Sequence, residues 1–148
     1  MSLAGAPAVR AARRGDFGAV AALLRASNLP VKGVPADLSA FLVGEDGGRV
    51  VGAIGLELFG ADALLRSAVV DASVRGTGLG AQLVHGIIGE AGRRGVGTLW
   101  LLTTTAERWF PRFGFAAASR DDVPPSVKAS AEFRGACPDS AFVMRRAV

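Results

Sequence analysis

The 148-residue sequence contains no tyrosine, one cysteine and one histidine. The single cysteine, Cys137, excludes an intramolecular disulfide and any metal site built from several cysteines. The lone histidine, His85, likewise excludes a histidine cluster, and we expect no bound metal. No apolar run approaches the ~20 residues that a membrane helix needs, and no signal-peptide pattern opens the chain. We therefore expect a cytoplasmic protein without a membrane partner.

Charged residues make up only 20% of the chain and hydrophobic residues 50%, which excludes a disordered protein. At this length we expect one domain over residues 1–148. The net charge of +4 raises the question of nucleic acid, but the arginines are scattered, with no dense run and few interleaved aromatic residues. An anionic cofactor explains the basic excess equally well, so we expect no nucleic-acid partner.

Hydrophobic periodicity and turn residues predict alternating strands and helices. The expected strands cover residues 8–12, 41–43, 49–59, 63–70, 98–104, 114–119 and 141–145. The expected helices follow an N-cap at Asp16, begin at Leu79, cover residues 106–112, and run from Pro124–Pro125 to about Phe133. Three meandering strands followed by a strand–helix–strand crossover predict a mixed sheet with helices on both faces. Residues 1–9, rich in small side chains, are expected to fray at the terminus.

The most informative segment connects the strand ending at Val70 to the helix beginning at Leu79. It contains Arg75-Gly76-Thr77-Gly78-Leu79-Gly80, and glycine lets a backbone approach a ligand without a Cβ in the way. The first N–H groups of the following helix are unpaired and lie at the positive end of its dipole. This geometry suits a pyrophosphate, so the loop predicts a nucleotide-like cofactor. An ordinary capped turn is the alternative.

Spacing separates the families that use such loops. A dinucleotide fold needs G-x-G-x-x-G and an acidic residue about 20 residues later, where this chain has the apolar run 99–102. A P-loop needs a lysine that is absent here. The loop resembles the acyl-CoA pyrophosphate loop of GNAT N-acetyltransferases, Arg/Gln-x-x-Gly-x-Gly/Ala, at every fixed position. The segment from Phe110 to Phe115 resembles the aromatic-x-x-x-Gly-Phe ending of a later helix in that family.

The GNAT resemblance covers residues 9–147 and implies a fold of the α/β (α+β) class. That fold is a mixed six- to seven-stranded twisted sheet with helices on both faces, whose central parallel strands splay apart. The resemblance also implies acetyl-CoA as co-substrate and a small-molecule amine as acceptor, and a homodimer is a possible assembly. It assigns the cofactor to Val69, Val70, Arg75, Gly76, Thr77, Gly78, Leu79, Gly80 and Phe110. A bulge before the loop is expected to free the backbone N–H of Val69 or Val70 for the thioester carbonyl.

A narrower resemblance joins this chain to the GNAT branch encoded with arsenic-resistance operons. The segments that carry it are residues 55–57, 64–67, 101–106, 129–133 and 137–141. The Leu-Thr-Thr and Trp109-Phe110 elements also resemble the acetyltransferase domain of N-acetylglutamate synthases. Both comparisons imply an amino-acid-like amine as acceptor, and the first implies a role in resistance to toxic metabolites or arsenicals. For Cys137 a structural role is favoured over a bond to arsenic, because a single thiol makes a poor site for this element.

Glu57 is the predicted general base, because it ends an otherwise apolar strand, where a semi-apolar cleft raises the pKa of a carboxyl. A solvated strand edge is the alternative for this residue. The usual acid of the family is a tyrosine, whose place Phe110 takes here. Water, Ser67 or a threonine such as Thr104 must therefore protonate the leaving thiolate, unless it departs unprotonated. The missing tyrosine also supports a rival function, a catalytically weak acyl-CoA-binding regulatory module.

The acceptor is predicted to bind Arg66, Thr103 and Thr105, because a guanidinium can hold an anionic group near the amine. The segment 132–140 is expected to close over these residues from the C-terminal side. Exposure of Arg66 on the opposite strand face is the alternative. His85 is expected to be a surface or satisfied histidine, and Trp109 to pack in the core rather than over the cofactor arm.

Overall fold

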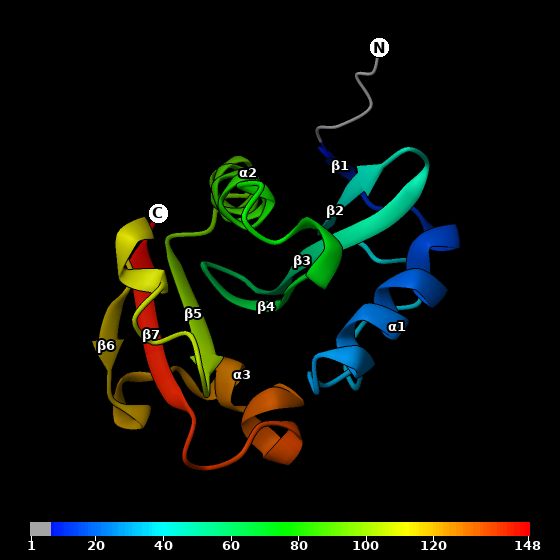
Figure 1. Ribbon diagram of the computed structural model, residues 1–148. Coiled ribbons are helices and arrows are strands. Elements are labelled where there is room, and N and C mark those ends of the chain that lie inside the picture. The colour runs from blue at the N-terminus through cyan, green and yellow to red at the C-terminus, as the bar shows by residue number, and fades with distance from the viewer. Residues whose placement is uncertain (1–6) are drawn as a thin grey trace.

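The computed structural model describes residues 7–148 and shows one twisted sheet with helices on both sides (Figure 1). The strands are β1 (Ala8–Ala11), β2 (Phe41–Asp46), β3 (Arg49–Phe59), β4 (Asp62–Val70), β5 (Thr98–Thr103), β6 (Ala116–Ala118) and β7 (Phe142–Ala147). The helices are α1 (Phe17–Ala26), α2 (Leu79–Arg93) and α3 (Pro125–Lys128). The fold class expected from the sequence is confirmed. Of the segment expected to fray, residues 1–6 lie outside the described residues, and Ala8 and Val9 belong to β1.

The sheet has seven strands in the order β1-β2-β3-β4-β5-β7-β6. Strands β1 to β4 form an antiparallel meander, and β4 then pairs with β5 in parallel. That parallel pairing covers only Asp62–Leu64 against Thr98–Trp100. Beyond these residues the two strands separate, while β5 stays paired with β7 along its length. The predicted splay of the central parallel strands is therefore confirmed.

Two apolar layers hold the helices against the sheet. Helix α2 covers one face with Leu79, Leu83, Val84, Ile87 and Ala91, whose spacing places them on one side of the helix. Helices α1 and α3 cover the other face (Figure 1), each over its own cluster of buried side chains. Among residues 7–148 no helix combines the length and apolarity needed to cross a membrane.

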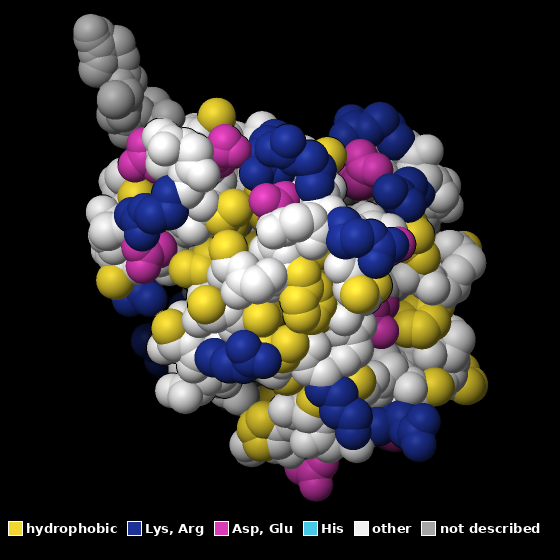
Figure 2. Space-filling model, turned by 90° about the vertical axis from the view of Figure 1, so that its right-hand side faces the viewer, with side chains coloured by type: hydrophobic (Ala, Val, Ile, Leu, Met, Phe, Trp, Pro, Cys, Tyr) yellow, Lys and Arg dark blue, Asp and Glu magenta, His cyan; other side chains and the backbone are white. Residues whose placement is uncertain are grey.

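Basic side chains are dispersed on the face shown in Figure 2. Lys and Arg lie in separate groups there, several of them beside Asp or Glu, and hydrophobic side chains fill much of the middle (Figure 2). Three arginines in the described chain pair with carboxylates at 2.9 Å or less near the surface: Arg10, Arg93 and Arg94. The basic side chains on this face are therefore interspersed with acidic and apolar ones (Figure 2).

Several boundaries differ from the predicted ones for local reasons. The helix expected over 106–112 is a turn followed by a 3-10 turn at Phe110–Phe113, because Pro111 lacks the N–H that an α-helix needs. The last helix ends at Lys128 rather than near Phe133, and a separate turn follows at Glu132–Ala136. Asp16 stands at the expected N-cap of α1, but its carboxylate accepts from Arg10 and from the backbone of Arg13 instead of capping the helix.

Candidate acyl-transfer site

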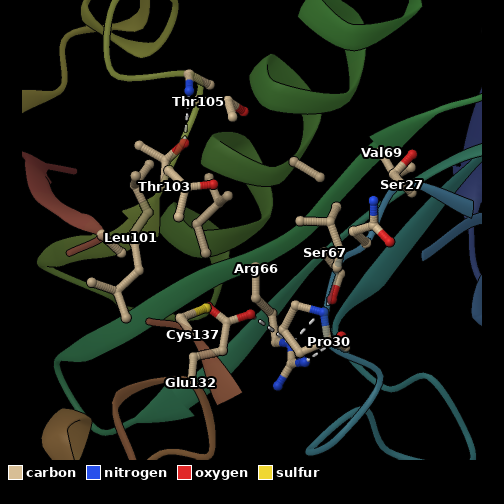
Figure 3. Close-up of a pocket in the computed structure, with 18 of the residues that line it drawn as sticks. Ser27, Pro30, Arg66, Ser67, Val69, Leu101, Thr103, Thr105, Glu132 and Cys137 are labelled. Carbon is tan, nitrogen blue, oxygen red and sulfur yellow. Dashed lines mark hydrogen bonds and ion pairs between the residues drawn. The ribbon is translucent and has the colours of Figure 1, made fainter. Parts of the chain in front are cut away.

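A cavity of about 490 Å³ occupies the gap where β4 and β5 separate. Its walls come from four parts of the chain that are distant in sequence: the end of α1 and the following loop, the second half of β4, the end of β5, and the C-terminal segment around Cys137 (Figure 3). Arg75 of the glycine-rich loop also lines it. The splay therefore creates a channel that begins at the loop and ends among the polar side chains near Arg66.

The glycine-rich loop presents free backbone donors at the start of α2. Gly76 and Gly78 have φ values of 84° and 88°, which favour glycine, and their N–H groups donate to no acceptor within the described part of the chain. The same holds for the N–H groups of Gly80 and Ala81 in the first turn of α2. Together with the helix dipole, these donors fit a pyrophosphate group. The Leu79 side chain points into the core, so this residue can serve a cofactor only through its backbone.

Strand β4 contains a bulge at Ser67, whose φ is 61°. Its register against β3 shifts between Ala53 and Gly55, so the chain of β4 gains one residue there. The N–H of Asp71 donates to the carbonyl of Val51, and bonded and non-bonded pairs alternate along an antiparallel ladder. The amide of Val69 therefore faces β3, whereas that of Val70 faces the gap toward β5. The sequence left open whether the N–H of Val69 or of Val70 meets the thioester carbonyl, and the register favours Val70.

Arg66 does not offer a free charge to the cavity. Its side chain is fully buried, and four of its five N–H donors are used. They bond to the Glu57 carboxylate at 2.7 Å, the Ser67 hydroxyl at 3.0 Å, and the carbonyls of Pro30 and Lys32 at 3.2 and 2.9 Å. The expectation that Arg66 binds an anionic acceptor therefore needs correction, because an added carboxylate would have to displace these partners.

Glu57 lies behind Arg66 rather than in the cavity. Its carboxylate pairs with the Arg66 guanidinium, and the residue is absent from the cavity wall. A base must reach the proton that it removes, directly or through one water. Glu57 therefore does not lie where the predicted general base should be. Its contact with Arg66 instead holds the guanidinium in place.

Glu132 and Cys137 enter the site from the C-terminal segment (Figure 3). The turn at Glu132–Ala136 closes through two i,i+5 backbone bonds and a positive φ at Gly135, and it directs Glu132 inward. Burial raises the pKa of Glu132 to about 7, against the opposing effect of Arg66. Burial likewise raises the pKa of the Cys137 thiol to about 11. The sequence predicted that this segment closes the site, but it assigned no role to Glu132. No motif marks this residue apart from its place in the segment.

The remaining predicted residues lie around the same cavity. Thr103, Thr104 and Thr105 line its β5 side, and the Thr103 hydroxyl accepts from the backbone N–H of Ala106 at 2.9 Å. Trp109 and Phe110 also contribute to the wall. The buried ring of Phe110 packs edge to face against the rings of Trp109 and Phe115. His85 is exposed on α2 and contacts the ring of Phe113 edge to face, which agrees with the surface position expected as one of its two alternatives.

Comparison with known proteins agrees with this geometry. A family model described as an acetyltransferase (GNAT) domain matches residues 37–117, which is more than half of the chain. The chain therefore belongs to the GNAT acetyltransferase family. The family is one of acetyltransferases, as the sequence predicted. Within residues 7–148 no group of three or more His, Cys, Asp or Glu residues is arranged to hold a metal ion.

Several solved structures share the fold. N-acetylglutamate synthase from Neisseria gonorrhoeae, complexed with coenzyme A and N-acetyl-glutamate, is 24% identical with a TM-score of 0.81, and the match covers 95% of this chain and 35% of that one. This chain thus spans about a third of that synthase. Rv2747 from Mycobacterium tuberculosis, in complex with CoA and NLQ, is 21% identical with a TM-score of 0.78 over 96% of this chain and 99% of that one. The ribosomal-protein-S18-alanine N-acetyltransferase of Escherichia coli is 19% identical with a TM-score of 0.68 over 96% and 94%. Comparison with curated protein sequences finds no match.

Proposed function

We propose that this protein transfers the acetyl group of acetyl-CoA to the amine of a small, amino-acid-like molecule. The observation that carries the proposal is a cavity that extends from Arg75 of the glycine-rich loop to the polar end formed by Ser67, Glu132 and Cys137. A volume of about 490 Å³ suits the pantetheine arm and a compact acceptor. The likeness to N-acetylglutamate synthase, complexed with N-acetyl-glutamate, supports an acceptor of amino-acid size.

The co-substrate is held chiefly by the backbone in this proposal. The amides of Gly76, Gly78 and Gly80 bind the pyrophosphate, and Arg75 adds a positive charge at the mouth of the cavity. The pantetheine arm fills the gap between β4 and β5, with Phe110 in the wall. The amide of Val70 then donates to the thioester oxygen, which gains negative charge as the amine attacks.

Ser67 is the proposed proton donor to the leaving thiolate. Its oxygen accepts from Nε of Arg66 at 3.0 Å, which leaves the hydroxyl proton free to point into the cavity. The neighbouring guanidinium charge also favours loss of that proton, because it stabilises the negative charge that remains. Thr104 lines the opposite wall and is the alternative donor, whereas Thr103 already accepts from the backbone of Ala106.

Replacement of Ser67 by glycine tests this role without adding strain, since glycine tolerates the positive φ of 61° at this position. We expect kcat to fall on the order of 10²-fold, the scale of a lost proton-transfer group, with the affinity for acetyl-CoA unchanged. Steady-state thiol release and calorimetry measure the two quantities. Thr104→Val is the matched variant on the other wall, and a larger loss there than at Ser67 would reassign the donor to Thr104.

The amino-acid-like acceptor class includes toxic analogues of amino acids, so we extend the proposal to a role in resistance. The similarity to the arsenic-resistance GNAT branch supports it, and Cys137 lies at the acceptor end of the cavity. The thiol is half-buried and its pKa is raised to about 11, which does not favour a thiolate ligand for arsenic. Amine acetylation rather than arsenic binding is therefore the proposed basis of resistance. A cytoplasmic location is proposed because the co-substrate is an intracellular metabolite.

A thiol-release assay with purified protein, acetyl-CoA and a panel of amines tests the function directly. We include glycine, L-glutamate, ethanolamine and agmatine, which share an amine and differ in their other charges. Amine-dependent release of CoA above the rate without protein is the expected result. Tight acetyl-CoA binding without release for any amine in the panel would favour the rival reading, a regulatory module that binds acyl-CoA.

A further inference from the structure

Glu132 is a buried carboxylate at the acceptor end of the cavity that the steps proposed above do not use. The residue is 4% exposed and contributes to the cavity wall. It lies beside Arg66 and Cys137 (Figure 3). A buried carboxylate that borders a ligand cavity, and that has a thiol hydrogen bond but no short ion pair, is a candidate for proton transfer.

The charges around Glu132 do not balance. Arg66 donates to Glu57 at 2.7 Å, whereas its Nε is 3.7 Å from Oε2 of Glu132, which is too long for a hydrogen bond. One guanidinium thus faces two carboxylates, and the better pairing goes to Glu57. Ionised Glu132 leaves a surplus negative charge, so this end of the cavity attracts an ammonium group. An anionic group on the same acceptor has to point away from it.

The position of Glu132 also fits the direction of attack. Ser67 and Glu132 both contact the Nε edge of Arg66, at 3.0 and 3.7 Å. The thioester carbon lies beside Ser67 and Val70 if the pantetheine arm follows the gap between β4 and β5. An amine that approaches this carbon from the C-terminal segment therefore passes next to the Glu132 carboxylate.

We infer that Glu132 is the general base of the reaction, which receives the acceptor as an ammonium and takes its proton before attack. This inference rests on the proposed acetyl transfer. It replaces Glu57, the base expected from the sequence, with a residue 75 positions further along the chain that the fold brings to the same arginine.

Each bond that forms in the proposed reaction is matched by one that breaks. Glu132 removes one proton from the ammonium, and the neutral nitrogen forms a bond to the thioester carbon. The C–S bond then breaks, and the sulfur carries away its electron pair as a thiolate. Ser67 delivers its proton to the thiolate and takes up the second proton of the nitrogen, so the serine is regenerated and the products are the acetamide and CoA. Glu132 returns its proton to the solvent.

The surroundings of Glu132 suit a base that works near neutral pH. Burial and the charge of Glu57 raise the pKa of Glu132, Arg66 and a hydrogen bond with Cys137 lower it, and the result is about 7. Cys137 faces it from the same segment and stays protonated, because burial and Glu132 raise the pKa of the thiol to about 11. The charge of Arg120 acts on Cys137 in the opposite direction and lowers the pKa of its thiol. A base with a pKa near the working pH is the most effective one.

Glu132→Gln tests the inference because it keeps the shape of the side chain and removes the base. For the panel amine with the highest kcat/KM, we expect kcat to fall 10²- to 10⁴-fold. The wild-type rate should fall as the pH drops below about 7, and this acid limb should disappear in the variant. The affinity for acetyl-CoA, measured by calorimetry, should stay unchanged. Asp139→Asn, at an exposed position of the same segment outside the cavity, is the control and should keep the wild-type rate and pH profile.

A second acceptor separates a base from a merely structural residue. Hydroxylamine is largely neutral at pH 7 and needs no base, so the loss in Glu132→Gln should be at least tenfold smaller with hydroxylamine than with the panel amine. An equal loss with both nucleophiles would overturn the inference, as would a variant that retains activity within threefold and keeps the acid limb. If the wild-type protein releases no CoA with any amine, acetyl transfer itself fails, which is a different result.

Discussion

Replacement of Arg66 by alanine is expected to destabilise the fold by about 3–5 kcal/mol, which is the usual loss when one member of a buried ion pair is removed. The side chain is fully buried, and its loss leaves the carboxylates of Glu57 and Glu132 without their cation. It also leaves the carbonyls of Pro30 and Lys32 without a donor. Urea denaturation at pH 8 measures the change as a lower midpoint. Because small proteins have only about 5–15 kcal/mol of stability, this loss removes a large part of the total.

Arg49→Ala is the matched control for this experiment. Arg49 also pairs with a carboxylate, Asp71 at 3.5 Å, but its side chain is 63% exposed. Solvent screens such a pair, so its loss should change the stability by less than about 1 kcal/mol. Equal changes in the two variants would show that the Arg66 cluster is hydrated in solution and would remove the physical basis for its structural role.

Replacement of Gly78 by valine is expected to weaken acetyl-CoA binding by roughly 10- to 100-fold. Gly78 has a φ of 88°, and a β-branched residue held there stores about 1–3 kcal/mol of strain. The space around its missing Cβ is open, so valine acts on the backbone rather than by a clash within the protein. Relief of the strain rotates the peptide groups of the loop and removes their amides from the pyrophosphate. Isothermal titration calorimetry with acetyl-CoA measures the loss.

Gly95→Val provides a control with the same local strain. Gly95 has a φ of 79°, no atom lies within 4 Å of its missing Cβ, and it follows the opposite end of α2. This variant should lose a similar amount of stability while it keeps the wild-type affinity for acetyl-CoA. Unchanged affinity in a folded Gly78→Val protein would show that the loop does not bind the cofactor.

Much of the fold could be predicted because its signals are local. Strand β3 lies at the predicted residues 49–59, since apolar runs bounded by Gly47–Gly48 and Gly60 leave little choice. Helix α2 begins at the predicted Leu79, after a loop whose glycines permit positive φ values. The boundaries around Pro111 and Glu132 were harder to predict, because weak helical signals there compete with tertiary contacts.

The cofactor end of the candidate site could also be predicted from a local signal. The residues from Arg75 to Gly80 form the loop by themselves, and the helix that follows supplies the dipole, so six consecutive positions indicated a pyrophosphate site. The acceptor end has no such local pattern. Its walls come from α1, β4, β5 and the C-terminal segment, which are brought together only when the sheet forms.

The sequence by itself thus determined the order of strands and helices, the glycine-rich loop and the family. Only the tertiary structure decided what the charged residues do, because the charge that a side chain presents depends on its partners. Arg66 is neutralised by Glu57 on β3 and held by carbonyls of the loop after α1, and Gly33 leaves room for its guanidinium. Glu132 reaches the same arginine from the C-terminal segment with a weaker contact. Burial and pairing are properties of the folded chain, so the sequence could name the ionisable residues but not which carboxylate stays available for chemistry.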